Sequence, residues 1–492
     1  MQSAKIKSVK FNFLMNAILT ASSFVFPFIT FPYISRVLLP EGVGKVNFAT
    51  SVVSYFCMFA MLGIPTYGVR TCAQVRDDRE ELSRVVHEIL FINFLMSIAV
   101  YGIYFWALYN VPRLKSDFLL FCVTGATVFI NIIGVEWLYK GLEQYSYITI
   151  RSIAFKIIAV CLMFLYVKDR TDYVVYGAIS VFAAVGSNIL NFINLRKYID
   201  LRPVGNYHFQ RHMRAILFFF LMSVATTIYT NLDVVMLGFM KDDTAVGYYS
   251  TAVKIKNILV SFVTALSTVL LPRVSYYIEH GMREQFIQTG QKALNFVILA
   301  ASPVTVYFTM FADESILLLS GDAFQGSVIP MIIIMPTVLF IGVTNILGIQ
   351  ILVPLGKEKL VFYSVLAGAV VDLLINAACI PGMAASGAAL GTVIAEGVVL
   401  AVQVLMLKDL IGQISKSLQV VKIFLAVAGG AAGSLWLKWT DMPCFIRLSV
   451  SAIIFFGIYG WILLAAKEPF LCEVTKQLYS VRRKKRGGNG NR

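Results

Sequence analysis

Long apolar runs of about 20 residues, separated by short polar segments, dominate the sequence. Membrane β-strands would instead alternate between apolar and polar residues over about 10 positions. Lipid offers the backbone no hydrogen-bond partners, and a helix satisfies its backbone groups internally. The pattern therefore predicts an all-α polytopic membrane protein with about 14 transmembrane helices, approximately at residues 11–35, 46–66, 87–108, 117–138, 148–167, 173–195, 214–239, 246–271, 290–311, 327–352, 360–380, 386–406, 418–438 and 445–466.

Composition agrees with this class, because 58% of the residues are hydrophobic and only 14% are charged. Most Lys and Arg residues fall at the two ends of the chain and in the loops that follow even-numbered helices. Cytoplasmic loops carry such an excess, so both termini are expected in the cytoplasm. This asymmetry and anionic lipid headgroups account for the net charge of +15 without nucleic-acid binding.

Three pairs of segments repeat in the same order at a nearly constant separation. LPEGVGKVNFATSV resembles KDDTAVGYYSTAVK, LYKGLEQYSYI resembles VPLGKEKLVFY, and YGAIS resembles SGAAL. The repeats predict two pseudo-symmetric six-helix lobes, residues 1–200 and 201–410, followed by two extra helices in 411–470 and a basic cytoplasmic tail at 471–492. Because six is even, the lobes are parallel, and a substrate site between them is a known transporter arrangement.

Several predicted helices carry a stripe of polar residues on one face, and Ser23 belongs to the stripe of the first helix. The members with the most distinctive chemistry are Asn47, Lys156, Asp233, Lys254 and Asn257. A single stripe of this kind is more often a helix contact than a pore lining. Stripes on repeat-related helices, with ionisable groups at membrane depth, favour a hydrated cavity, although an ion pair between Asp233 and Lys254 or Lys256 is an alternative. Lys256 points away from the stripe, which suits a structural partner or snorkelling.

The basic residues expected near the cavity suggest what it attracts. Arg36, Lys156 and Lys254 form a cationic lining, which concentrates an anionic solute and suits phosphate. Nearer the cytoplasmic face, Arg70, Arg151 and Glu136 are candidates for capture or gating.

The second lobe instead carries acidic and amide groups inside its predicted helices. Asp372 lies one turn from Asn376, and Glu396 ends the segment TVIAE in the next helix. Their oxygen atoms could hold a sodium ion or a proton, and a buried carboxylate paired with a neighbour is the alternative interpretation. No cofactor is expected apart from such Na⁺ or H⁺ coupling.

Four segments, SFVFPFITFPYISRVLLPEGVGKVNFATSVVSYF, LGIPTYGVR, EWLYKGLEQYSYITIRS and IPGMAASGAALGTVIAE, resemble the Wzx-type oligosaccharide flippases of the multidrug/oligosaccharidyl-lipid/polysaccharide exporter superfamily. The resemblance covers the first twelve predicted helices, and residues 136–152 are its most specific part. It implies two six-helix lobes around a central cavity in a bacterial cytoplasmic membrane.

The resemblance also implies the substrate, a polyprenyl diphosphate that carries a short oligosaccharide for O-antigen, capsule or another exopolysaccharide. A monomer in the lipid bilayer is expected, with polymerase and other polysaccharide-assembly proteins as partners. Related lipid II flippases have a cation site on helices seven, eleven and twelve. On this chain that site would comprise Asp233, Asp372, Asn376 and Thr392.

Other classes of protein remain alternatives at this point. A lipid II flippase would share every physical feature above, and a multidrug exporter of the same superfamily would favour an acidic or aromatic pocket. A membrane enzyme would need a sizeable external loop with reactive groups, and none is predicted. The seven scattered cysteines form no CxxC pair, so neither a metal centre nor a disulfide framework is expected.

Overall fold

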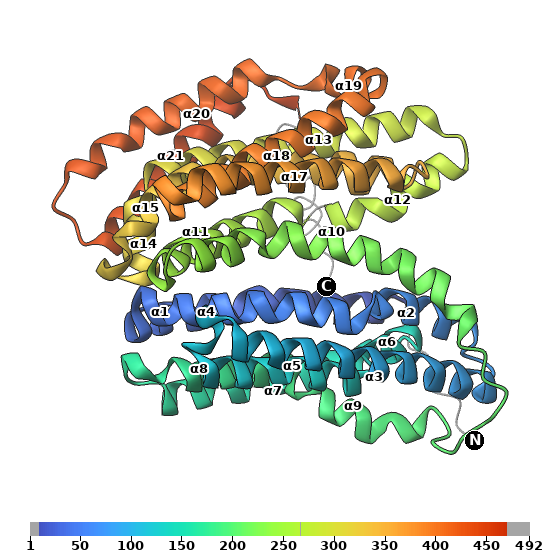
Figure 1. Cartoon of the computed structure of the whole chain (residues 1–492). Helices are drawn as coiled ribbons and strands as arrows, with labels where there is room; N and C mark the ends of the chain where they lie inside the picture. Colours follow the sequence, from blue (N-terminus) through green and yellow to red (C-terminus); the bar gives the residue numbers. More distant parts are fainter. Residues whose placement is uncertain (1–8, 266, 470–492) are drawn as a thin grey trace, which may run out of the picture. The chain divides into compact units, whose positions relative to one another are not determined.

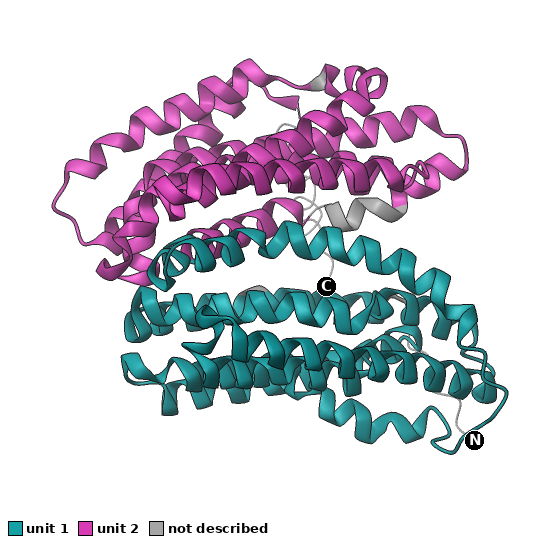
Figure 2. Cartoon of the chain, viewed as in Figure 1, with its two compact units in different colours: residues 1–250 teal, residues 251–492 magenta. Residues whose placement is uncertain are grey.

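The computed structural model describes residues 9–265 and 267–469, and all regular structure in these ranges is helical (Figure 1). The predicted basic tail at 471–492 lies outside the described residues. The chain divides into two compact units, residues Met1–Ser250 and Thr251–Arg492 (Figure 2). The two units are defined by which residues pack together, whereas the two lobes are predicted from repeated sequence segments. The lobe boundaries therefore stay predictions.

In the first unit, α1 packs against α3, α5, α7 and α10. Its helical segments are α1 (Val9–Met61), α2 (Ile64–Gln74), α3 (Arg79–Asn110), α4 (Pro112–Lys115), α5 (Phe118–Gly134), α6 (Glu136–Gly141), α7 (Tyr145–Tyr166), η1 (Arg170–Asp172), α8 (Tyr173–Val181), η2 (Phe182–Gly186), α9 (Asn188–Asn194), η3 (Leu195–Lys197) and α10 (Gln210–Met240). The next helix, α11 (Asp243–Thr264), begins in the first unit and ends in the second.

In the second unit, α17 packs along α18, and α20 packs along α21. The helical segments of this unit after α11 are α12 (Ser267–Glu279), α13 (Arg283–Met310), α14 (Ala312–Ser320), η4 (Asp322–Ser327), α15 (Val328–Ile334), α16 (Pro336–Asn345), η5 (Ile346–Leu352), α17 (Glu358–Met383), α18 (Ala385–Met406), α19 (Lys408–Ile414), η6 (Ser415–Ser417), α20 (Val420–Leu435), η7 (Trp436–Trp439) and α21 (Cys444–Ala465).

The first two predicted spans run together in α1, a helix of 53 residues. It is interrupted at Leu39, whose φ of 59° lies in the left-handed region, directly before Pro40. Proline lacks an amide hydrogen and restricts the residue before it, which explains a break at this point. The break separates the two halves of α1 where the sequence predicts a loop.

Ten helices of the described chain are long and apolar enough to cross a membrane, and eleven if the bent pair Asp322–Ile334 and Pro336–Leu352 forms one span. The number is lower than fourteen partly because α1 and α2 form one continuous apolar stretch and α5 has only 17 residues. The protein is thus an all-helical, multi-pass membrane protein.

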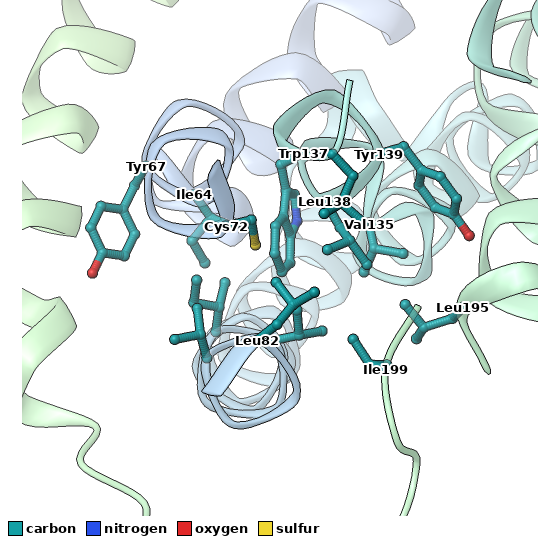
Figure 3. Packing of buried hydrophobic residues seen from close by; sticks show 14 of the residues in the cluster. Ile64, Tyr67, Cys72, Leu82, Val135, Trp137, Leu138, Tyr139, Leu195 and Ile199 are labelled. Atoms are coloured by element: carbon teal, nitrogen blue, oxygen red, sulfur yellow. The ribbon is translucent and has the colours of Figure 1, made fainter. Parts of the chain in front are cut away.

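A cluster of buried hydrophobic side chains holds α2, α3 and α6 together (Figure 3). Trp137 on α6 lies in the middle of this cluster beside Cys72. A Cβ built on Gly68 of α2 would lie 2.6 Å from the Trp137 ring, so only glycine fits there. The EWLYKG segment is therefore a packing element that fixes α6 against α2.

Candidate functional site

Lys156 on α7 lies against the first half of α1. Its ammonium group donates hydrogen bonds to Ser22 Oγ at 2.9 Å and to Ser23 Oγ at 3.1 Å, and it lies 5.9 Å from the centre of the Phe26 ring. The side chain is half-buried. Since Ser23 belongs to the predicted polar stripe of the first helix, the structure joins two predicted stripes through this lysine.

Arg36, also on α1, is exposed. Its guanidinium donates a hydrogen bond to the carbonyl of Pro32 at 2.7 Å, one turn earlier. On the second half of α1, Asn47 has a buried side-chain nitrogen without a hydrogen-bond partner in the described part of the chain. A buried amide hydrogen without an acceptor costs free energy, so Asn47 is suited to contact a polar ligand.

Arg151 and Glu136 meet where α6 adjoins α7. Arg151 is buried, donates to the carbonyl of Ser187 at 3.0 Å, and lies 3.4 Å from the Glu136 carboxylate. Glu136 also lies 2.8 Å from Lys140. The structure thus brings these two predicted residues together, whereas the third, Arg70 on α2, is exposed. Arg151 thus joins the start of α6 to α7.

Asp233 on α10 is buried and accepts a hydrogen bond from the hydroxyl of Tyr249 on α11. A second carboxylate, Asp243, pairs with Arg113 at the start of α11. Burial raises the pKa of the Asp243 carboxyl, and the Arg113 guanidinium acts in the opposite direction. Tyr249 and Arg113 were not predicted as site residues, because their contacts depend on how separate helices pack against each other.

The two lysines of α11 differ in exposure. Lys256 is only 8% exposed, Lys254 is half-buried, and Asn257 is exposed. Their separation by two positions turns the lysines to different sides of the helix, as the sequence predicts. The role of Lys254 in a cavity stays a prediction.

In the second unit, Asp372 and Asn376 approach one point on α18. A Cβ built on Gly391 would lie 2.2 Å from Asn376 Oδ1 and 3.0 Å from Asp372 Oδ1. Both side chains are buried, so their oxygen atoms meet at a glycine that leaves them room. Glu396, one to two turns further along α18, is also buried, and Thr392 donates its hydroxyl to the carbonyl of Ala388 at 3.0 Å.

A second polar contact between α17 and α18 was not predicted. Gln403 Nε2 donates to Ser364 Oγ at 3.1 Å, and both residues are buried. Polar side chains therefore meet between α17 and α18 at two places, of which the sequence indicated only the one at Asp372 and Asn376. Nowhere in residues 9–265 and 267–469 do three or more His, Cys, Asp or Glu residues gather in a way that could hold a metal ion.

Comparison with known proteins assigns the family. The profile of the family described as "Polysaccharide biosynthesis protein" matches residues 9–278, and the profile named "MatE" matches residues 219–378. Two proteins named "Putative O-antigen transporter" are similar in sequence. The one from Escherichia coli (strain K12) is 22% identical over 75% of this chain and 89% of its own length, and the one from Shigella dysenteriae is 23% identical over 74% and 91%.

Solved structures show the same fold. The lipid II flippase MurJ, in an inward closed conformation, is similar with a TM-score of 0.70 and 15% identity over 92% of this chain and 98% of that chain. An inward-facing multidrug resistance MATE family transporter of the MOP superfamily gives a TM-score of 0.59 and 11% identity over 78% and 95%.

The first family profile covers more than half of the chain, and both sequence relatives are aligned over most of their own length. Residues 9–278 include most of the sequence segments that resemble the Wzx-type flippases. This chain therefore belongs to the polysaccharide biosynthesis protein family, and it shares its fold with the two solved structures.

Proposed function

We propose that this protein is a flippase that moves polyprenyl-diphosphate-linked oligosaccharide across the bacterial cytoplasmic membrane. The observation that carries the proposal is the family match over residues 9–278 together with two sequence relatives that bear the name of O-antigen transporters. The substrate head is a diphosphate with sugars, which cannot cross hydrocarbon unaided because burying an unpaired charge is very costly.

The chemistry of the candidate residues supports an anionic substrate. Lys156 lies inside a predicted span, and its ammonium donates hydrogen bonds to two neutral hydroxyl groups, those of Ser22 and Ser23. Such hydroxyl groups orient the ammonium without neutralising its charge. We propose that Arg36, Lys156 and Lys254, with Asn47 and Asn257, line the route of the head while the polyprenyl tail stays in lipid.

The architecture proposed for this route comprises fourteen membrane spans, two six-helix lobes that rock between inward-open and outward-open states, and a pair of additional helices. Arg70 and Arg151, with Glu136, would capture or gate the substrate at the cytoplasmic face. Asp372, Asn376, Thr392 and Glu396, with Asp233, would bind the Na⁺ or H⁺ that couples the cycle to a gradient. We further propose that the protein acts as a monomer beside the polymerase.

A lipid II flippase is the second candidate, favoured by the similarity of the fold to MurJ over 92% of this chain. Both substrates share the polyprenyl diphosphate and differ in the group attached to it. A multidrug exporter would instead select cations. The three candidate functions can therefore be distinguished by which substrate the protein transports.

The test is transport in proteoliposomes that contain the purified protein. Three fluorescent probes are compared: a polyprenyl-diphosphate oligosaccharide, lipid II, and a lipophilic cationic dye. We expect protein-dependent movement of the first probe and little of the other two. Movement of lipid II alone would support the second candidate, and movement of the dye alone would contradict both flippase proposals.

A further inference from the structure

Residues 198–209, here named the linker, connect η3 to α10 and lie along the N-terminal end of α3. Arg79 Nη2 lies 2.8 Å from Asp200 Oδ1, and Arg84 Nε donates a hydrogen bond to the carbonyl of Gly205 at 3.1 Å. His87 Nδ1 lies 3.1 Å from the hydroxyl of Tyr207. The linker is therefore fixed by side chains on successive turns of one helix.

The last of these contacts is made by Glu88, whose side chain is fully buried. One of its oxygen atoms accepts a hydrogen bond from the backbone N–H of His208, near the end of the linker. The other lies 2.7 Å from Arg211 Nη2, 3.0 Å from Arg211 Nε and 2.6 Å from His212 Nε2. Glu88 thus ties the linker and the start of α10 to α3.

His212 is buried between Glu88 and Tyr67 of α2. Because the carboxylate of Glu88 only accepts, Nε2 of His212 carries its hydrogen toward Glu88. The other nitrogen, Nδ1, lies 2.5 Å from the hydroxyl of Tyr67, which points away from the hydrophobic cluster of Figure 3. A tyrosine hydroxyl both donates and accepts, so it satisfies Nδ1 whether the ring is neutral or protonated.

This arrangement lets the imidazole take up a proton without breaking a hydrogen bond. The hydroxyl of Tyr67 turns from donor to acceptor, and the new charge lies beside the Glu88 carboxylate. The other charged groups of the cluster, Arg211, Glu81 and Arg84, are paired: Arg211 lies 2.6 Å from Glu81, which also contacts Arg84. Because Glu88 is already paired with Arg211, one more proton places a second positive charge in a buried site beside that guanidinium and weakens the contact between α10 and α3.

We propose that Glu88, His212 and Tyr67 form a proton-binding site that locks the linker onto α3 while His212 is neutral, so that protons on the linker's side of the membrane regulate the transport cycle. The effect on transport rests on the proposed function. It would arise because the linker joins the two predicted lobes. The charge distribution of the loops predicts that this side is the cytoplasm. Binding of the proton loosens the lock and frees the start of α10, and its release restores the lock.

The lock itself is tested without transport. Hydrogen–deuterium exchange of residues 198–212 is measured on the purified full-length protein between pH 8 and pH 5.5, after correction for intrinsic exchange rates. We expect exchange to become faster by about tenfold as the pH falls. Exchange of the wild-type linker that does not change with pH would overturn the proposal, whatever the variants do.

Two matched variants assign the effect to a residue. His212→Gln keeps a donor for Glu88 but cannot gain charge, so its linker exchange should be independent of pH and as slow as in the wild-type protein at pH 8. His87→Gln, on the neighbouring position of α3, should retain the pH dependence. Loss of the pH dependence in H87Q, or its retention in H212Q, would contradict the assignment.

Transport in proteoliposomes then separates this inference from the proposed function. With the diphosphate oligosaccharide as probe, the wild-type rate should depend on the pH of the compartment that faces the linker, and the H212Q rate should not. Equal pH profiles for the two proteins would overturn the regulatory role and leave the flippase proposal standing. Absence of transport at every pH would count against the flippase proposal, while the exchange result would still decide the lock.

Discussion

Gly44 on α1 and Gly247 on α11 lie in backbone contact: a Cβ built on Gly44 would lie 2.9 Å from the amide nitrogen of Gly247. The same Cβ would lie 1.7 Å from the carbonyl oxygen of Asp243, and a Cβ on Gly247 would lie 2.0 Å from that of Pro40. Each glycine thus meets the residue four positions before the other. Such reciprocity is a property of contacts across a two-fold axis.

The two segments in contact are those that the sequence aligns as copies of one repeat, with Gly44 on Gly247. Two copies of a duplicated unit would produce this reciprocity if their axis passed between the glycines. Any side chain at either position would separate α1 from α11. The contact therefore supplies a physical reason for both glycines.

Replacing either glycine by alanine should destabilise the protein strongly. The added methyl group would overlap a backbone carbonyl oxygen, which cannot move as a flexible side chain does. We expect Gly44→Ala and Gly247→Ala each to lower the free energy of unfolding by about 1–3 kcal/mol or more. Thermal unfolding in detergent, followed by intrinsic fluorescence, is the measurement.

Gly102→Ala on α3 is the matched control, because nothing lies within 4 Å of the position that its methyl group would take. Its melting temperature should stay unchanged or rise slightly, since alanine favours a helix more than glycine does. Melting temperatures that are the same for all three variants would show that α1 and α11 do not approach this closely.

The sequence predicted some of these features better than others. Apolar run length is a local property, and it predicted the helical membrane class. Helical periodicity is also local, and it predicted the polar stripes that carry Ser23 and Lys156 and the different facing of Lys254 and Lys256. The repeat indicated that Gly44 and Gly247 correspond. It could not predict that they touch, because that depends on how helices far apart in the chain pack.

Contacts between residues far apart in the chain account for most of what was missed. Nothing local in the sequence indicates that Glu88 and His212 meet at 2.6 Å. The hydrogen bond between Gln403 and Ser364 was missed for the same reason. At both Ser364 and Gln403, the signal that could have found the contact is a polar residue inside an apolar run.

Trp137 should contribute to the stability of the fold and not to transport. It is 3% exposed in the cluster of α2, α3 and α6, and it fills the space over Gly68. Trp137→Ala should lower the free energy of unfolding by about 3–5 kcal/mol through the cavity it leaves. Trp106→Ala, at a residue 66% exposed on α3, should have a much smaller effect on the melting temperature.

The two lysines of α11 should respond differently to substitution. Lys254→Ala is expected to reduce transport of the diphosphate probe by about tenfold, because a charge-assisted contact is lost, with little change in melting temperature. Lys256→Ala, at a buried position, should lower the melting temperature. Lys254→Arg should retain most of the transport. Normal transport by a well-folded K254A protein would remove this residue from the proposed route.

The contact of Asp372 and Asn376 with Gly391 should control ion coupling. Asp372→Asn removes the charge that would attract Na⁺ or H⁺, so transport should lose its dependence on the ion gradient. Gly391→Ala should also abolish the dependence on the ion gradient, because its methyl group would lie 2.2 Å from Asn376 Oδ1 and displace that oxygen. Gly397→Ala on the same helix, where the nearest atom lies 3.9 Å away, is the control and should keep the dependence.

These three variants are compared by initial transport rates with and without imposed Na⁺ and proton gradients. If D372N and G391A respond to the gradients as the wild-type protein does, the pair is a structural contact between α17 and α18. A response lost in both but kept in G397A would assign the coupling ion to this point. The glycine then matters because it leaves room for two oxygen atoms, since any side chain there would occupy the place where the cation must bind.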